Sequence, residues 1–208
     1  MAIIEPQRRS GRSGLRMVLW FAVLVLAVVG IALWASNDRS RPASPSSFGG
    51  PFGGQFTLVD RTGRTVTEKS LAGRPYAIFF GFTRCPDVCP TSLARMARLR
   101  KQLGADGMKF NIVFVSVDPH HDQPAGIGSY VDLFGTPIIG LTGTDAQIAR
   151  ISTGFGVFVR KVPTEGGDYT IDHTAAIYLM TARGELAGTI DHQEADTVAL
   201  EKLRRLIG

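Results

Sequence analysis

Cysteine is scarce in this chain, with only two among its 208 residues. Scaffolds held together by disulfides carry more cysteines at higher density, so the composition excludes that class of protein. The two residues, Cys85 and Cys89, are close in sequence, and a bridge between them would close a small loop and stabilise the fold little. We therefore interpret the pair as chemically active rather than structural.

The chain also lacks the widespread basic charge that is typical of nucleic-acid-binding proteins. The formal net charge is +5, but residues 1–36 contribute +3 of it through four arginines and one glutamate, which leaves +2 for the rest. A basic segment in front of an apolar run is typical of membrane topology. We predict a membrane-anchored protein that does not bind nucleic acid.

The apolar run extends from Met17 to Ala35, with Trp20 and Trp34 near its ends. At about 1.5 Å per residue, a helix of this length matches a hydrocarbon core about 30 Å thick. A cleaved signal peptide would have a shorter apolar region and a small-x-small cleavage site, and Leu33-Trp34-Ala35 is a poor one. We predict a transmembrane anchor at 17–35 with a cytoplasmic basic tail at 1–16.

The remaining chain divides into a linker and one domain. Residues 36–54 are rich in Pro, Gly and Ser, which predicts a flexible linker, so the folded domain is predicted at 55–208. In the domain we expect hairpins at 56–67 and 157–172, strands at 76–80, 111–117, 138–141, 175–180 and 186–190, and helices at 90–103, 124–134, 144–152 and 194–206. This order resembles a thioredoxin-like α/β fold, a mixed sheet flanked by helices with inserted β-hairpins.

The two cysteines lie between a predicted buried strand and a predicted helix, and each is followed by proline. Proline disfavours a helical conformation in the residue before it, so we expect the helix to begin at Pro90 and Cys85–Cys89 to form a loop ahead of it. The helix dipole then favours thiolate at both sulfurs. The spacing exceeds Cys-x-x-Cys by one residue and leaves room for Cu(I) or Zn(II), which would need a third ligand.

Four histidines are candidates for that third ligand. His120 and His121 follow a predicted strand in a polar loop, and His192 precedes the last helix, so all three are expected at the surface. His173 stands at the mouth of a buried strand, where a lone histidine is more often a structural residue. The residue pattern alone therefore leaves the third ligand open.

Four segments together resemble the Sco/SenC family of membrane-anchored copper proteins in the thioredoxin superfamily. They are Phe-Phe-Gly-Phe-Thr-Arg-Cys-Pro-Asp-Val-Cys-Pro-Thr (79–91), Val-Ser-Val-Asp-Pro (115–119), Gly-Leu-Thr-Gly-Thr (140–144) and Ile-Asp-His-Thr-Ala-Ala-Ile-Tyr-Leu-Met (171–180). The resemblance runs from about Gly53 to the C-terminus and implies that Cys85, Cys89 and His173 bind copper. The sequence departs from the usual family pattern at His120-His121-Asp122, where a charged pair is commoner.

The chemistry of these donors agrees with copper. Two thiolates and an imidazole form a soft set suited to Cu(I) and, with an added weak ligand, to Cu(II). The cysteine pair can also oxidise to a disulfide, which links metal release to redox state. Asp87 is either an acid at the helix start or a group that tunes the ligands, and Asp118 and Asp172 are weaker candidates for hydrogen bonds to them.

The resemblance implies a metallochaperone that assists assembly of the binuclear copper centre of cytochrome c oxidase. It would deliver copper to the second subunit of the oxidase or reduce the cysteines of that subunit, together with periplasmic copper chaperones or thioredoxin-like reductants. We expect a single-pass protein of the bacterial inner membrane with its domain in the periplasm.

Two alternatives remain at this point. One is a thiol–disulfide oxidoreductase or peroxidase in which Cys85 is the nucleophile, Cys89 completes the redox pair and His173 is dispensable. The other is a redox or copper sensor that signals through its anchor, which the short basic tail disfavours because it offers no effector module.

Overall fold

The structure is a computed structural model that describes residues 17–18, 20–29 and 52–208. The chain divides into two units, Met1–Ser44 and Pro45–Gly208. In the first unit, residues 17–18 and 20–29 are helical and expose apolar side chains. Among the described residues, no helix is both long enough and apolar enough to cross a membrane. The predicted tail, the last third of the predicted anchor and most of the predicted linker lie outside the described residues.

The second unit is built on a mixed sheet, as predicted, and this sheet has seven strands. Its strands are β1 (Thr57–Asp60), β2 (Thr65–Thr67), β3 (Tyr76–Gly81), β4 (Asn111–Ser116), β5 (Ile138–Thr142), β8 (Ile177–Met180) and β9 (Leu186–Ile190). Their order is β2-β1-β5-β4-β3-β8-β9, with β3, β4 and β5 parallel and the outer strands antiparallel. All six residues of β3 are buried, which explains why its sequence is apolar without alternation.

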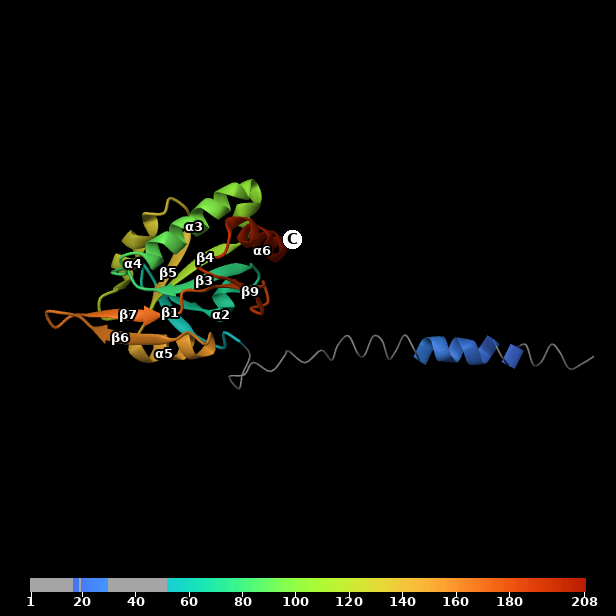
Figure 1. Ribbon diagram of the computed structural model, residues 1–208. Helices are drawn as coiled ribbons and strands as arrows, with labels where there is room; N and C mark the ends of the chain where they lie inside the picture. Colours follow the sequence, from blue (N-terminus) through green and yellow to red (C-terminus); the bar gives the residue numbers. More distant parts are fainter. Residues whose placement is uncertain (1–16, 19, 30–51) are drawn as a thin grey trace, which may run out of the picture. The chain divides into compact units, whose positions relative to one another are not determined.

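Helices cover both faces of this sheet (Figure 1). They are α2 (Glu68–Leu71), α3 (Val88–Gln102), the 3₁₀ helix η1 (Gly104–Lys109), α4 (Pro124–Asp132), α5 (Asp145–Gly154) and α6 (Asp196–Ile207). On one face Tyr130 of α4 packs against Phe114 of β4, which lies beside Phe79 of β3. On the other face Phe155, at the end of α5, packs against Phe80. Alternate residues of β3 therefore serve two separate apolar layers.

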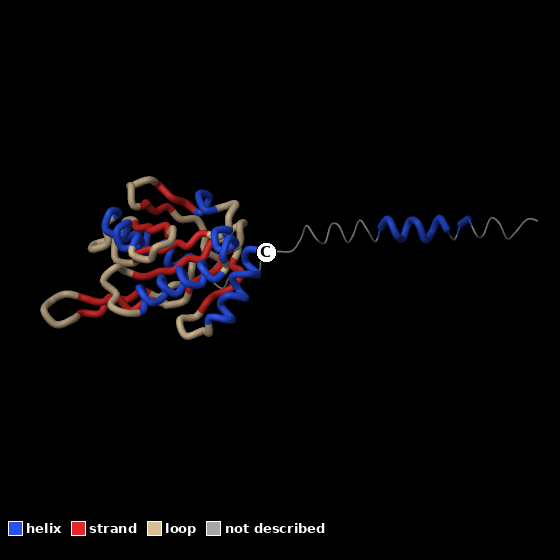
Figure 2. The backbone as a smooth tube through the Cα atoms, turned by 90° about the horizontal axis from the view of Figure 1, so that it is seen from above, coloured by secondary structure: helices blue, strands red, loops and turns tan. Residues whose placement is uncertain are grey.

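A second, two-stranded sheet is formed by β6 (Val159–Pro163) and β7 (Tyr169–His173), the predicted second hairpin. The strands are antiparallel, with Val159 opposite His173 and Pro163 opposite Tyr169. The hairpin projects from the side of the domain (Figures 1 and 2). Because β7 runs back toward the large sheet, its last residue, His173, is carried to the end of β3.

Short elements and element ends differ from the sequence prediction. The helices α2 and η1 were not predicted, since four and six residues carry too little periodicity for a pattern to appear. Phe52, which the sequence places in the linker, packs against Phe155 and Tyr178, and Gly53 donates its N–H to the Gly154 carbonyl. The predicted N-cap of α5 is confirmed, because the Thr144 side chain accepts from the N–H of Gln147 in a capping box.

Candidate metal centre

The loop that carries the two cysteines joins β3 to α3. The helix begins at Val88 with Asp87 as its N-cap, so the prediction that it begins at Pro90 is wrong by two residues. Pro90 occupies the third helical position, where the N–H has no partner within the helix and its loss costs nothing. Cys89 consequently lies inside the first turn, while Cys85 remains in the loop ahead of it.

The Cys89 sulfur is buried against the end of β3. An added Cβ at Gly81 would lie 2.7 Å from Cys89 Sγ and 3.0 Å from a ring carbon of Phe114. An ordinary non-bonded contact is about 3.5–4.0 Å, so the sulfur fills the space that a side chain at this position would need. Gly81 is therefore part of the site, although sequence reasoning did not single it out.

The Cys85 sulfur is partly exposed and surrounded by hydrogen-bond donors. The backbone N–H of Cys89 points at Cys85 Sγ, 3.4 Å away, because the loop folds over the first turn of α3. The hydrogen bond from the Cys89 side chain, together with those from the N–H groups of Cys89 and Asp87, lowers the pKa of Cys85 to about 3, against the opposing effect of burial. Cys85 is thus a thiolate at neutral pH.

The Cys89 thiol has the opposite tendency. Its hydrogen bond to the Cys85 sulfur, its burial and the negative charges of Cys85 and Asp122 raise the pKa of Cys89 above its ordinary value. The two sulfurs are not bonded to each other. The negative charge of the pair is therefore favoured on Cys85 and the proton on Cys89.

His173 faces the sulfurs from the end of β7. Its Nδ1 lies 3.0 Å from the Thr174 carbonyl oxygen, which can only accept, so Nδ1 carries the proton. Nε2 is left with a free lone pair and lies 3.5 Å from Cys89 Sγ. The rings of Phe79 and Phe82 stand edge-on to the imidazole, each with its centroid 6.0 Å away. This arrangement fixes both the tautomer and the direction of the lone pair.

The structure brings the three predicted ligands together. One donor atom from each of Cys85, Cys89 and His173 lies within 4.8 Å of the other two, and among the described residues this is the group of metal-ligating side chains that meets that spacing. A thiolate, a second thiol and an unprotonated imidazole nitrogen fit a soft cation. The same donors bind Zn²⁺, which favours four ligands.

The predicted accessory acids lie in different surroundings. Asp87 is the exposed N-cap of α3, and its carboxylate accepts from the Thr91 hydroxyl at 3.2 Å. Asp172 points away from His173, because neighbouring strand residues face opposite sides, and it pairs with Arg160 at 2.5 Å. Asp118 is fully buried and belongs to a polar cluster. This cluster lies beside residues 82–87 between β3 and α3, which we call the thiol loop.

Three further residues near the site were not identified from the sequence. Asp122 is buried and accepts from both the N–H and the hydroxyl of Thr83, which precedes Cys85 by two positions. Arg84 and Tyr169 both contact Asp118. For Tyr169 a signal existed, since it lies on β7 four positions before His173 and the period of two places both on one face.

The other histidines do not join the three donors. His120 Nε2 pairs with the Asp145 carboxylate at 3.2 Å, and His121 Nδ1 lies 3.0 Å from Asp118. His192 Nδ1 lies 3.3 Å from the Ser92 hydroxyl. His120 and His121 are exposed, as expected, whereas His192 is half-buried.

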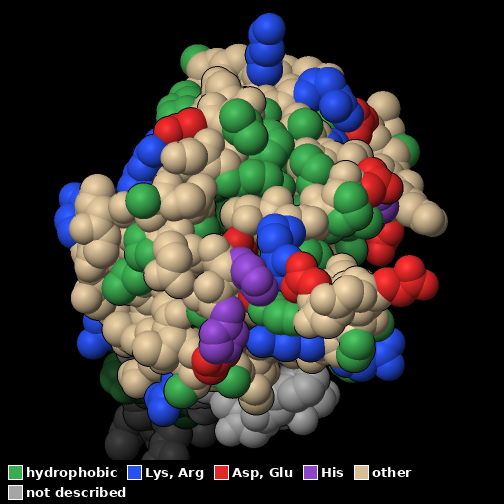
Figure 3. Space-filling view, turned by 90° about the vertical axis from the view of Figure 1, so that its left-hand side faces the viewer, with side chains coloured by type: hydrophobic (Ala, Val, Ile, Leu, Met, Phe, Trp, Pro, Cys, Tyr) green, Lys and Arg blue, Asp and Glu red, His purple; other side chains and the backbone are tan. Residues whose placement is uncertain are grey.

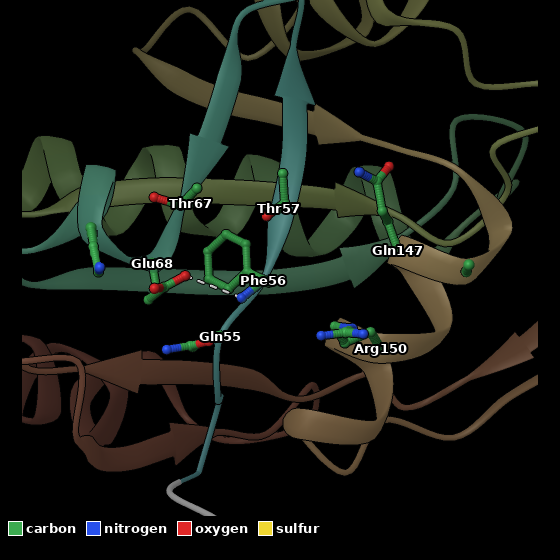
Figure 4. A pocket seen from close by; sticks show the side chains of 9 residues that line it. Gln55, Phe56, Thr57, Thr67, Glu68, Gln147 and Arg150 are labelled. Atoms are coloured by element: carbon green, nitrogen blue, oxygen red, sulfur yellow. Dashed lines mark hydrogen bonds between the residues drawn. The ribbon is translucent and has the colours of Figure 1, made fainter.

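A cavity of about 530 Å³ lies elsewhere, between the start of β1, α2 and α5 (Figure 4). It is lined by Gln55, Phe56, Thr57, Thr67, Glu68, Lys69, Ala146, Gln147 and Arg150. Glu68 is engaged with the backbone N–H of Phe56, as Figure 4 shows. None of the three sulfur and nitrogen donors lines this cavity, so it is separate from the candidate centre.

Comparison with known proteins places this geometry in a family. The SCO1/SenC family model matches residues 44–208. The mitochondrial SCO1 homolog 1 of Arabidopsis thaliana is 37% identical over 149 residues, which cover 70% of this chain and 44% of that protein. The chain therefore spans less than half the length of this relative.

Two solved structures are also similar. Copper-bound ScoI of Bradyrhizobium japonicum is 44% identical with a TM-score of 0.69, and the match covers 74% of this chain and 99% of that one. Copper-bound Sco1 of yeast is 31% identical with a TM-score of 0.69, covering 75% of this chain and 88% of that one. With the family model matching most of its length, the chain belongs to the SCO1/SenC family.

Proposed function

We propose that this protein is a copper metallochaperone that holds copper on Cys85, Cys89 and His173. The observation that carries the proposal is the convergence of these three donors to within 4.8 Å of one another. Solved family members that contain copper support the identity of the metal. A low-pKa thiolate and an imidazole with a free Nε2 lone pair make copper a better fit than a hard cation.

The copper is cargo, and the proposed recipient is the second subunit of cytochrome c oxidase, in which the protein would help to complete the binuclear copper centre. Cys85 is the partly exposed donor, whereas Cys89 is buried, so a partner can reach the metal from the side of the loop. Release would also be favoured if a disulfide of the partner accepted two electrons and the pair closed to a Cys85–Cys89 disulfide, since this removes both sulfur donors.

We further propose that the apolar run beginning at Met17 anchors the protein in the bacterial inner membrane with the domain in the periplasm. The arginines ahead of that run support this orientation. Confinement to the membrane that holds the oxidase would raise the effective concentration of the two partners.

A second candidate function is reduction of disulfides in the same partner, and the low pKa of Cys85 favours it. The Cys85 thiolate would attack one sulfur of the partner disulfide and release the other as a thiolate. Cys89 would then attack the Cys85 sulfur in the mixed disulfide, and its proton would pass to the departing partner thiol. The products are a Cys85–Cys89 disulfide and a reduced partner, and a thioredoxin-like reductant would restore the pair.

The two functions are separated by titrating the purified full chain with Cu(I) under anaerobic conditions in the presence of a competing chelator. We expect one copper per chain in the wild type and an affinity at least about tenfold lower in His173→Ala, equivalent to about 1.4 kcal/mol. Cys85→Ser should also weaken binding. His120→Ala, which alters an exposed histidine paired with Asp145, is the matched control and should bind as the wild type does.

The outcome that would refute copper binding by this donor set is full affinity in His173→Ala. If that variant retained copper affinity while Cys85→Ser abolished reduction of a disulfide-bonded peptide, the reductase function would be the correct one.

A further inference from the structure

A polar cluster lies between the thiol loop and the β6–β7 hairpin, and the proposed function does not use it. We call it the Arg84 cluster; its members are Arg84, Asp118, His121, Asp168 and Tyr169. These residues come from three segments, namely the thiol loop, the loop after β4 and the beginning of β7. Figure 3 shows the side of the domain to which the hairpin projects, with histidine side chains beside basic and acidic ones.

The centre of the cluster is Asp118, whose side chain is 0% exposed. Its carboxylate accepts a hydrogen bond from the Tyr169 hydroxyl at 2.6 Å and lies 3.4 Å from the Arg84 guanidinium. His121 Nδ1 lies 3.0 Å from the same carboxylate, 3.1 Å from the guanidinium and 3.0 Å from the Tyr169 hydroxyl. A buried carboxylate is costly unless such partners satisfy it. Asp118 therefore favours the conformation in which Arg84 and Tyr169 are both in place.

Arg84 connects this centre to the hairpin. It directly precedes Cys85, and its guanidinium pairs with Asp168 at 2.7 Å and lies 3.4 Å from the Tyr169 carbonyl oxygen. The guanidinium also lies over the Tyr169 ring, 5.3 Å from the centroid. The Arg84 side chain thus contacts the Asp168 carboxylate and both the carbonyl oxygen and the ring of Tyr169.

The hairpin is held by its chain connections, in which three residues join His173 to β8, and by side-chain contacts. In the described part of the chain, β6 and β7 pair only with each other and are not joined to the seven-stranded sheet by backbone hydrogen bonds. Apolar contacts are made by Ile171, which is buried, and by the His173 ring against Phe79 and Phe82. Tyr169, Ile171 and His173 share one face of β7, so the contacts of Tyr169 and the imidazole lie at the two ends of the same strand.

We propose that the Arg84 cluster docks the β6–β7 hairpin against the thiol loop and thereby sets the position of His173 Nε2 relative to the two sulfurs. Arg84, Asp118 and Tyr169 are positioning residues in this proposal, because they act through the hairpin and touch neither the donor atoms nor the metal. The inference rests on the proposed function, since it concerns the same three donors. The competing explanation is that the apolar contacts of Ile171 and His173 suffice.

The test uses the full chain with Tyr169→Phe, which removes one hydroxyl and keeps the ring, and Arg84→Gln, which removes the charge. Arg84→Lys provides a milder second variant should Arg84→Gln fold poorly. Arg61→Gln is the matched control, because Arg61 forms a two-point ion pair with Asp132 outside the cluster. The measurements are Cu(I) affinity, thermal unfolding, and electron paramagnetic resonance of the Cu(II)-loaded chain, which reports nitrogen coupling from a bound imidazole.

We expect both cluster variants to remain folded and to lose copper affinity by roughly tenfold to a hundredfold, with a weakened nitrogen signal. Added free imidazole should restore the signal both in these variants and in His173→Ala, because in each case the missing element is a correctly placed ring. Arg61→Gln should match the wild type in all three measurements.

Two results would overturn the proposal. In the first, both variants keep wild-type affinity and nitrogen coupling, which would mean that the apolar contacts position His173 alone. In the second, affinity falls but free imidazole restores it only in His173→Ala, which would mean that the variants damage the fold rather than the placement. If the wild type itself shows no coupling that depends on His173, the proposed function fails first, and this result is distinct from the other two.

Discussion

Replacing Gly81 by alanine tests whether the Cys89 sulfur occupies the position that the structure gives it. The new Cβ would lie 2.7 Å from Cys89 Sγ and 3.0 Å from Phe114. The backbone of Gly81 is not in the left-handed region, so alanine brings no conformational penalty and the effect is purely steric. The contact is about 1 Å shorter than an ordinary one, and either the sulfur or the sheet must move.

The expected cost follows from the packing around this position. Cys89, Phe114 and Phe79 are all 0–1% exposed, so no neighbour can swing into solvent to relieve the contact. Inserting a methyl group into such a core costs about 1–3 kcal/mol. With a urea dependence of about 2 kcal/mol per molar, the unfolding midpoint should fall by roughly 0.5–1.5 M. Copper affinity should fall as well, because the displaced atom is a proposed ligand.

The assay is urea unfolding of the metal-free chain, followed by anaerobic Cu(I) titration of the same preparation. Gly126→Ala is the control, since an added Cβ there meets nothing within 4 Å in helix α4, and it should stabilise the protein by roughly 0.5–1 kcal/mol. Unchanged stability and unchanged copper affinity in Gly81→Ala would show that the sulfur does not lie against the end of β3, and the geometry of the centre would have to be revised.

Two further predictions concern the groups around the thiols. Asp122→Asn should lower the free energy of unfolding by about 1–3 kcal/mol, since a buried carboxylate that accepts from three donors gains an N–H₂ group facing them. In the same urea assay the exposed Asp132→Asn should cost less than about 1 kcal/mol, and equal effects would contradict the argument. Because the pKa of Cys85 is about 3, its alkylation rate should stay flat between about pH 5 and 8, whereas an ordinary thiol reacts about tenfold faster per pH unit. Cys89→Ala removes the largest cause of the lowered Cys85 pKa and should make the alkylation rate rise with pH. Mass spectrometry measures alkylation in the wild type and in this variant. A rate that rises with pH in the wild type would disprove the thiolate.

The elements that the sequence predicted well are those whose pattern is set by burial. The run Tyr76–Phe80 has no polar alternation because both faces of β3 are covered. Thr144 was predictable as an N-cap because its hydroxyl accepts from an N–H of the helix that follows it. The start of α3 was misplaced because the preference of a residue before proline was overridden. Cys89 precedes Pro90 and still lies in the helix, where it is buried, and this burial outweighs the preference.

The donor residues of the candidate site could be predicted from the sequence, but the residues around them could not. Cys85 and Cys89 are neighbours in sequence, but His173 was selected only through the family resemblance, because its distance along the chain hides its proximity. The contacts of Arg84 and Tyr169 with Asp118 depend on how three loops and strands are placed in space. Contacts between side chains of distant segments leave no repeating pattern in the sequence. The sequence therefore predicted only that Tyr169 and His173 share one face of a strand.

The three donors also differ in when they become available to the metal. His173 follows Cys89 by 84 residues, so a chain made from its N-terminus presents both thiols well before the imidazole. The complete donor set exists only after β7 has been synthesised and has folded beside the cysteines, and such sites are rarely formed in an unfolded chain. Copper at a free concentration one hundred times its dissociation constant then stabilises the native state by about 2.7 kcal/mol. Loading on the proposed ligands would therefore select finished molecules over incomplete ones.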